Sequence, residues 1–158
     1  MLRTTLVRSS AFLMAACLCA CSALAADESA FADPVVAKLN DKVLRFLQDV
    51  SQGKEQEAFD DLLAGSQLAE QSAAVKGLIE KSKGIVDRYG VHRENEAISA
   101  KRIGKDVVLL KYLFKCEKFP VVWHLAYYRD SARANNAADD HWVVISIRFD
   151  TQLESLAN

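Results

Sequence analysis

The side chains that could carry acid–base or metal chemistry are few and lie far apart in this sequence. Its three histidines, His92, His124 and His141, show no HxxxH spacing, and no CxxC pair accompanies them. A metal site needs several His, Cys, Asp or Glu ligands around one ion. The run Asp139-Asp140-His141 is more typical of a solvated junction between a loop and a strand. We therefore expect no metal site.

Motifs for nucleotide binding and for hydrolysis are not found either. No GxGxxG, GxxxxGK[ST] or GxSxG motif occurs, so neither a dinucleotide site, a phosphate loop nor a hydrolase nucleophile is predicted, and we expect no cofactor. His124 is the most prominent remaining candidate because it lies in an apolar stretch. We expect it to face outward or toward an interface and to form one hydrogen bond. A catalytic role would require its strand to face the opposite way.

Residues 107–151 must position these groups, and they predict three strands. Apolar residues alternate with period 2 over residues 107–116, 120–129 and 141–151, so successive side chains point to opposite faces. The more uniformly apolar set is expected to face inward: Val108, Leu110, Tyr112, Phe114, Val121, Trp123, Leu125, Tyr127, Val143, Ile145, Ile147 and Phe149. The alternate residues, among them Trp142 and Val144, are expected to face outward. A register slip or a bulge would invert part of this assignment.

Three helices and a polar strand are predicted before this stretch. Asp33-Pro34 predicts a helix start, because the carboxylate can cap the first turn and Pro is tolerated at the first helical position. A second helix is expected over residues 54–64, and a third begins at residue 67 or 72 and ends at 89. Gly77 and Gly84 weaken the third helix by about 1 kcal/mol each relative to Ala, unless they permit close packing. The charged residues 91–103 are typical of an edge strand.

Residues 1–25 have the features of a secretory signal peptide. Arg3 and Arg8 precede the apolar residues 11–20, and Ala23-Leu24-Ala25 offers the small residues that signal peptidase needs. We expect cleavage after Ala25, which leaves one α+β domain over residues 26–158 in the periplasm or outside the cell. No later stretch is long and apolar enough to span a bilayer.

Cysteine use and charge narrow the possible partners. The residues around Cys17 and Cys21 resemble imperfect lipoprotein processing sites, so a lipid anchor at either is an alternative to simple cleavage. Cys116 is expected to be a small, partly buried strand residue, or else a thiol for intermolecular pairing. The net charge is −1 and no basic stripe is present, which weighs against nucleic acid as a partner.

The order of three helices and an antiparallel meander, with the strands FPVVWHLAYYR and HWVVISIRFD, resembles the nuclear transport factor 2-like superfamily over residues 33–156. This superfamily includes ketosteroid isomerases, scytalone dehydratase, polyketide cyclases of the SnoaL type and small exported bacterial proteins. The resemblance implies an α+β fold in which N-terminal helices pack on a curved antiparallel sheet of about four strands. It also implies a cone, open at one end, whose lining determines the function. Activity does not follow from it, because fold does not fix function.

Inside such a cone, the inward positions make Tyr112, Trp123 and Tyr127 candidate lining residues for a small apolar ligand, unless they only pack the core. Isomerases and dehydratases of this superfamily place an Asp or His and a Tyr inside the cone. The inward strand positions here hold no carboxylate and no imidazole, which counts against catalysis because proton transfer needs a titratable group in reach.

Three further residues, Asp87, Tyr89 and His92, lie near the end of the third helix. They could reach the mouth of the cone, or they lie at a solvated helix end.

Taken together, these features of the sequence lead us to expect an exported, non-catalytic domain that binds a small ligand or another protein. The alternatives are an isomerase- or dehydratase-like enzyme that uses the cone cavity, and an envelope-tethered structural lipoprotein. The apolar residues on the outward face predict a homodimer through the sheet.

Overall fold

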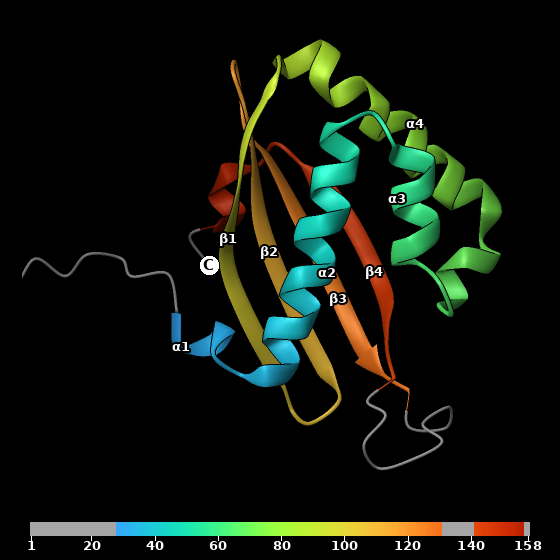
Figure 1. Cartoon of the computed structure of the whole chain (residues 1–158), viewed down its shortest axis with the longest axis vertical. Helices are drawn as coiled ribbons and strands as arrows, with labels where there is room; N and C mark the ends of the chain where they lie inside the picture. Colours follow the sequence, from blue (N-terminus) through green and yellow to red (C-terminus); the bar gives the residue numbers. More distant parts are fainter. Residues whose placement is uncertain (1–27, 131–140, 157–158) are drawn as a thin grey trace, which may run out of the picture.

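The computed structural model describes residues 28–130 and 141–156, in which helices cover one face of a four-stranded antiparallel sheet (Figure 1). The helical elements are α1 (Glu28–Phe31), α2 (Pro34–Ser51), α3 (Glu55–Leu62), η1 (Gln67–Glu70), α4 (Ser72–Tyr89) and η2 (Leu153–Leu156). The strands are β1 (His92–Ile103), β2 (Val107–Cys116), β3 (Val121–Arg129) and β4 (Trp142–Asp150). The predicted α+β fold, with its helices before its strands, is confirmed.

Helix α2 begins where the sequence predicts. The Asp33 carboxylate accepts hydrogen bonds from the backbone N–H of Val35 at 2.8 Å and of Val36 at 3.4 Å, which satisfies two donors of the first turn. Beyond its end, Gly53 takes a φ of +76°, the left-handed conformation that favours glycine. One stripe of the helix is buried against the sheet, and it consists of Val36, Leu39, Val43, Phe46, Leu47 and Val50.

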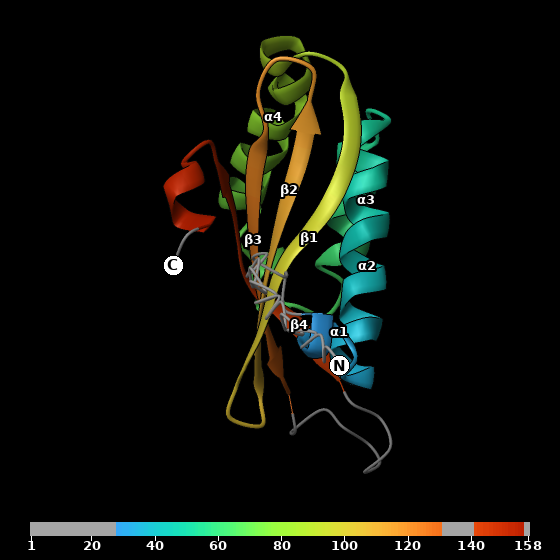
Figure 2. The same ribbon diagram turned by 90° about the vertical axis from the view of Figure 1, so that its left-hand side faces the viewer.

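The four strands are hydrogen-bonded in sequence order, β1-β2-β3-β4, with every neighbouring pair antiparallel. The predicted polar strand is therefore an edge strand, β1. Figures 1 and 2 show α2 and α3 over one face of the sheet and α4 along the side of β4. Figure 2 also shows η2 on the opposite face, which we call the outer face.

Strands β2 and β3 face as predicted. The inward residues of both strands are buried in the core: Val108, Leu110, Tyr112, Phe114, Val121, Trp123, Leu125 and Tyr127. Val122 lies on the outer face and is nevertheless fully buried. We attribute this to the chain after β4, which crosses to that side of the sheet and ends in η2 (Figure 2).

The prediction for the first half of β4 is wrong. Ala126 pairs with Ser146 and Tyr127 pairs with Val144, so Ile145 is an extra residue without an opposite partner, as in a β-bulge. Before the bulge the facing is inverted. Trp142 and Val144 point inward and are buried, Val143 points outward, and Ile145 is 47% exposed. Beyond the bulge, Ile147 and Phe149 face inward as predicted.

Several predictions concern residues outside the described ranges. The signal peptide over residues 1–25, the cysteines Cys17 and Cys21, and the acidic pair Asp139-Asp140 are among them. Within the described ranges, no helix combines the length and the apolar character needed to cross a bilayer. Cys116 is a free, buried thiol at the end of β2, as predicted, and its burial raises the pKa of the thiol above the ordinary value.

Candidate functional site

The three predicted lining residues lie inside the packed core. The Trp123 ring lies between Phe46, at a centroid distance of 5.3 Å, and Phe149, at 4.3 Å. Tyr112 is fully buried and its hydroxyl donates a hydrogen bond to Oδ1 of Asn40 at 2.8 Å. Tyr127 is 2% exposed. The four hollows described for this structure are lined by other residues, so these rings fill the interior.

Neither tyrosine is suited to act as a base. Burial raises the pKa of Tyr112 above the ordinary phenol value, and the nearby Tyr127 and Asp41 add to this rise. Burial also raises the pKa of Tyr127. Both hydroxyls therefore stay protonated near neutral pH and can only donate or accept hydrogen bonds.

His124 lies on the outer face, as predicted. Lys111 of β2 and Arg148 of β4 are its direct cross-strand neighbours. Its pKa is lowered from the ordinary value of 6.5, chiefly by partial burial and then by Arg148, while Asp150 opposes the shift. Because the strand is not inverted, His124 does not face the helices, and the acid–base role that required inversion has no support.

The other histidines do not join it. Nε2 of His92 lies 2.9 Å from Oδ1 of Asn95, and the His92 ring packs on Phe114 with centroids 4.3 Å apart. His141 precedes β4, where its carbonyl accepts a hydrogen bond from the N–H of Asp130 at 2.8 Å. In the described part of the chain, no three His, Cys, Asp or Glu side chains come together as metal ligands.

The largest of the four described hollows lies between α4, the start of β3 and the end of β4, and we call it the α4 groove. It has a volume of about 620 Å³ and is lined by Glu80, Lys81, Gly84, Ile85, Arg88, Tyr89, Val121, Phe149, Asp150, Thr151 and Gln152. Ligand pockets generally occupy about 300–1,000 Å³, so the groove has room for a small molecule. Of the three residues expected near the cone mouth, Tyr89 lines it, whereas Asp87 and His92 do not.

Apolar side chains from the core form part of the groove. Ile85 and Val121 are buried, and Phe149 is partly buried. The ring of Phe149 packs on Trp123 with an interplanar angle of 30°. Trp123, predicted to line a cavity, is thus separated from the groove by one ring.

The groove also carries charged side chains at its rim. Glu80 is paired with Lys83 at 3.0 Å, and the Asp150 carboxylate accepts a hydrogen bond from the backbone N–H of Gln152 at 2.9 Å. The Arg88 guanidinium lies over the Tyr89 ring at 6.0 Å from its centroid. Apolar surface with a few polar groups around it is the usual composition of a ligand site.

Gly84 sits in the middle of the α4 side of this groove. A side-chain carbon added there would meet no atom outside the local helix backbone within 4 Å. The same holds for Gly77, which lies about two turns earlier in α4. The alternative that these glycines permit close packing is therefore wrong. Gly84 leaves open space in the groove, whereas Gly77 is not among the groove's lining residues.

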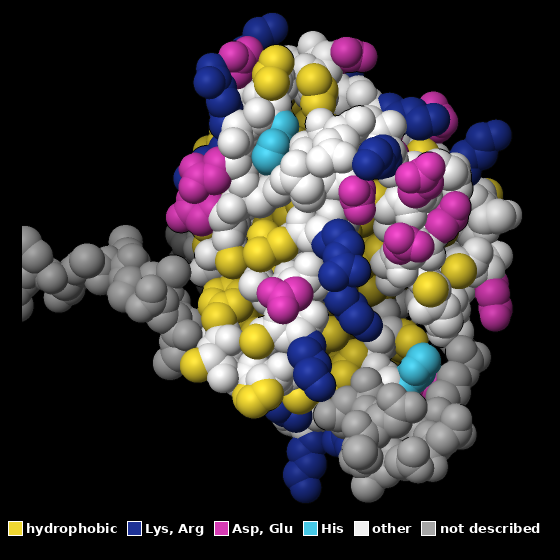
Figure 3. All heavy atoms as spheres, in the orientation of Figure 1, with side chains coloured by type: hydrophobic (Ala, Val, Ile, Leu, Met, Phe, Trp, Pro, Cys, Tyr) yellow, Lys and Arg dark blue, Asp and Glu magenta, His cyan; other side chains and the backbone are white. Residues whose placement is uncertain are grey.

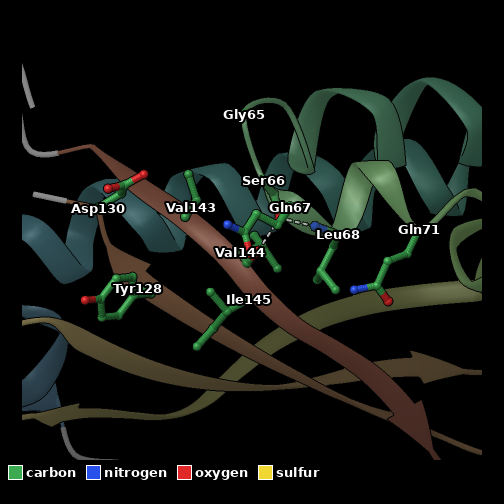
Figure 4. Close-up of a pocket in the computed structure, with 10 residues that line it drawn as sticks. All are labelled: Gly65, Ser66, Gln67, Leu68, Gln71, Tyr128, Asp130, Val143, Val144 and Ile145. Carbon is green, nitrogen blue, oxygen red and sulfur yellow. Dashed lines mark hydrogen bonds between the residues drawn. The ribbon is translucent and has the colours of Figure 1, made fainter. Parts of the chain in front are cut away.

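A second hollow, of about 290 Å³, lies beside β4 (Figure 4). Ser66 borders it, and its hydroxyl donates a hydrogen bond to the carbonyl of Val144 and accepts one from the N–H of Leu68 at 3.0 Å. Figure 4 shows Tyr128, Val143 and Ile145 on the strand side of this hollow. This hollow is smaller than the α4 groove. The Ser66 hydroxyl is already hydrogen-bonded to β4.

The sequence does not identify Lys81, Arg88, Thr151 or Gln152 as groove residues, and it predicts only inward positions for Val121 and Phe149. The sequence of α4 does contain a signal, because Lys81 and Arg88 flank Gly84 at helical spacing. The structure adds that no packing contact requires a glycine there.

Comparison with known proteins finds no matching family model, no matching curated protein and no matching solved structure. The resemblance to the nuclear transport factor 2-like superfamily therefore stays a prediction.

Proposed function

We propose that this protein is a non-catalytic binding domain that holds a small, partly apolar ligand in the α4 groove. One observation carries the proposal: a hollow of about 620 Å³ has apolar side chains continuous with the core and a rim of polar groups. Such a surface is costly to leave in water, and a ligand that covers it recovers about 25 cal/mol for each Å² of apolar area buried.

The titratable groups argue for binding rather than for proton transfer. Burial keeps Tyr112 and Tyr127 protonated, and His124 lies on the outer face. In the groove, Glu80 and Asp150 are held by partners within the chain. A general acid or base must be within hydrogen-bond reach of the proton that it transfers, and Tyr112, His124 and Tyr127 do not line the groove.

The two glycines of α4 provide a matched test. Gly84→Leu should fill the groove, whereas Gly77→Leu adds the same side chain to the same helix away from it. The neutral dye N-phenyl-1-naphthylamine, which fluoresces in apolar sites, serves as the probe. We expect saturable binding to the native chain and to Gly77→Leu, and about tenfold weaker binding to Gly84→Leu. Equal binding to both variants, or no saturable binding to the native chain, would overturn the proposal.

We further propose that the domain acts in the periplasm or outside the cell, after removal of residues 1–25. Arg3, the apolar residues 11–20 and Ala25 support this. Mass spectrometry of the protein exported by a bacterial host should find Ala26 as a free N-terminus. A lipid-modified Cys17 or Cys21 would instead support the envelope-tethered alternative.

A homodimer through the outer face is proposed on a separate observation. Four residues lie in register across the four strands, Ile103, Val107, Tyr128 and Val143, and the bulged Ile145 lies beside them. Ile103, Tyr128 and Ile145 are 48%, 43% and 47% exposed. We call these five residues the apolar row. Contiguous exposed apolar surface usually marks an interface.

Surface charge supports a protein partner rather than nucleic acid. On the helical face, Lys and Arg side chains lie along α2 while Asp and Glu gather on α3 (Figure 3).

Sedimentation at tens of micromolar tests the dimer: the native chain should sediment as a dimer and Tyr128→Lys as a monomer. A native chain that sediments only as a monomer would remove the dimer and leave the groove proposal intact.

A further inference from the structure

Resting on the proposed ligand groove, we infer that its ligand is an amphipathic anion. Lys81 and Arg88 bind the anionic group on either side of Gly84, and the apolar part of the ligand lies over Phe149.

Helical geometry places the two cations on one side of α4. Lys81, Gly84 and Arg88 are separated by three and four residues, the spacing that brings side chains to the same face. With a rise of 1.5 Å per residue, the two cationic positions lie roughly 10 Å apart along the helix axis. Both residues and the glycine between them line the groove.

Lys81 and Arg88 are the two cations at the rim of the groove. In the described residues, neither Lys81 nor Arg88 forms an ion pair with a carboxylate. Of the two acidic groups of the groove, Glu80 is paired with Lys83. Asp150 lies at the end of β4 rather than on α4, and the backbone hydrogen bond that it accepts does not cancel its charge. An anion that enters the groove therefore finds two donors without a carboxylate to displace.

Gly84 gives the anion access to those donors. Because no atom outside the local helix backbone lies within 4 Å of the position that a side chain would take there, an anionic group can approach the helix between the two cations. The Arg88 guanidinium lies over the Tyr89 ring, a contact that favours a defined position for an otherwise flexible side chain.

The opposite side of the groove determines the rest of the ligand. Phe149, which is only partly buried, offers apolar surface that a simple inorganic anion would leave uncovered, and the two cations offer charge that a neutral hydrocarbon would leave unused. A chain or ring that ends in a carboxylate, sulfonate or phosphate satisfies both sides.

Decanoate and decan-1-ol are matched probes because they share one alkyl chain and differ in charge. Decanoate is titrated below its micelle concentration and decan-1-ol below its solubility limit, each against N-phenyl-1-naphthylamine bound to the full exported chain. We expect decanoate to displace the dye at a concentration about tenfold lower than decanol does. Added salt should weaken decanoate and leave decanol unchanged, since salt screens exposed charges.

Variants assign this preference to the two cations. Lys81→Ala combined with Arg88→Ala should abolish the preference for decanoate while dye binding persists. Lys76→Ala, which removes a charge elsewhere on α4, should keep the preference. Equal displacement by both probes, or an equal loss in Lys76→Ala, would overturn the inference. If the dye itself fails to bind, the groove proposal fails instead, so the two failures are distinguishable.

Discussion

The rings of Trp123 and Phe149 lie with their centroids 4.3 Å apart and connect the centre of the core to the α4 groove. They end a series of four aromatic rings. Phe59 contacts Phe46 edge-on at 5.1 Å, and Phe46 contacts Trp123 edge-on at 5.3 Å. A ligand that covers Phe149 therefore touches the end of a series that begins on α3, so that core packing fixes the position of the groove's aromatic side.

The first prediction concerns Trp123. It is fully buried between two rings, so Trp123→Ala removes a large core side chain and should lower the free energy of unfolding by about 3–5 kcal/mol. Urea unfolding followed by far-UV circular dichroism measures this. A loss well below that range, together with loss of dye binding, would show that Trp123 lines a cavity rather than filling the core.

The hydrogen bond between Tyr112 and Asn40 gives a second prediction. Asn40→Leu removes the acceptor of a buried hydroxyl, and leaving such a group without a partner costs about 1–3 kcal/mol. Tyr112→Phe removes the hydroxyl as well, so the double variant should be more stable than the sum of the two single changes implies. Strict additivity in the double-mutant cycle would contradict the interaction.

The third prediction concerns the start of α2. Asp33→Ala removes the cap from the N–H of Val35 and an ion pair with Arg102 at 2.7 Å, and it should cost about 1 kcal/mol of stability, mostly through the cap. Asp41→Ala, at an exposed position of the same helix, should change stability little. An equal effect of the two substitutions in urea unfolding would argue against a specific cap.

The fourth prediction is a pH dependence at His124. Its pKa in the folded chain lies below 6.5 because partial burial and Arg148 disfavour the imidazolium. The unfolded chain therefore binds this proton more readily, so the contribution of His124 to stability is fully present above pH 6.5 and is lost as the pH falls through the lowered pKa.

His124→Gln should remove that part of the pH dependence. We expect the urea midpoint of the native chain to fall more steeply below pH 6.5 than that of the variant. The charged groups facing His124 are Lys111, Arg148 and Asp150, and none of them changes its charge in the variant. Parallel pH profiles for the two proteins would refute the prediction.

Local signals predicted most of the fold. Asp33 followed by Pro34 identified the start of α2, and strict alternation from Val108 to Phe114 identified the buried face of β2. These predictions succeeded because capping and period-2 alternation depend on residues close in sequence.

The facing of β4 could not be predicted in the same way. Ile145 is apolar and β-branched, so its side chain resembles an inward strand residue. Its exposure follows from an extra residue opposite β3, and the sequence of β4 alone does not show where a register shift occurs.

The site required contacts between distant segments. Tyr112 meets an acceptor 72 residues away in sequence, and the α4 groove joins α4 to the start of β3 and the end of β4. Apolar periodicity indicates which face of a helix is buried, but it carries no information on which strand ends face that helix. Lys81 and Arg88 therefore looked like ordinary surface charges.

The register shift at Ile145 and the Ser66 bond to the Val144 carbonyl have a consequence for assembly. They lie on β4, at one border of the sheet, while β1 at the other border carries charged residues and two register irregularities. An incoming strand needs a regular series of unpaired N–H and C=O groups. Both borders interrupt that series, so we expect that copies of this chain do not join strand to strand into open-ended fibres.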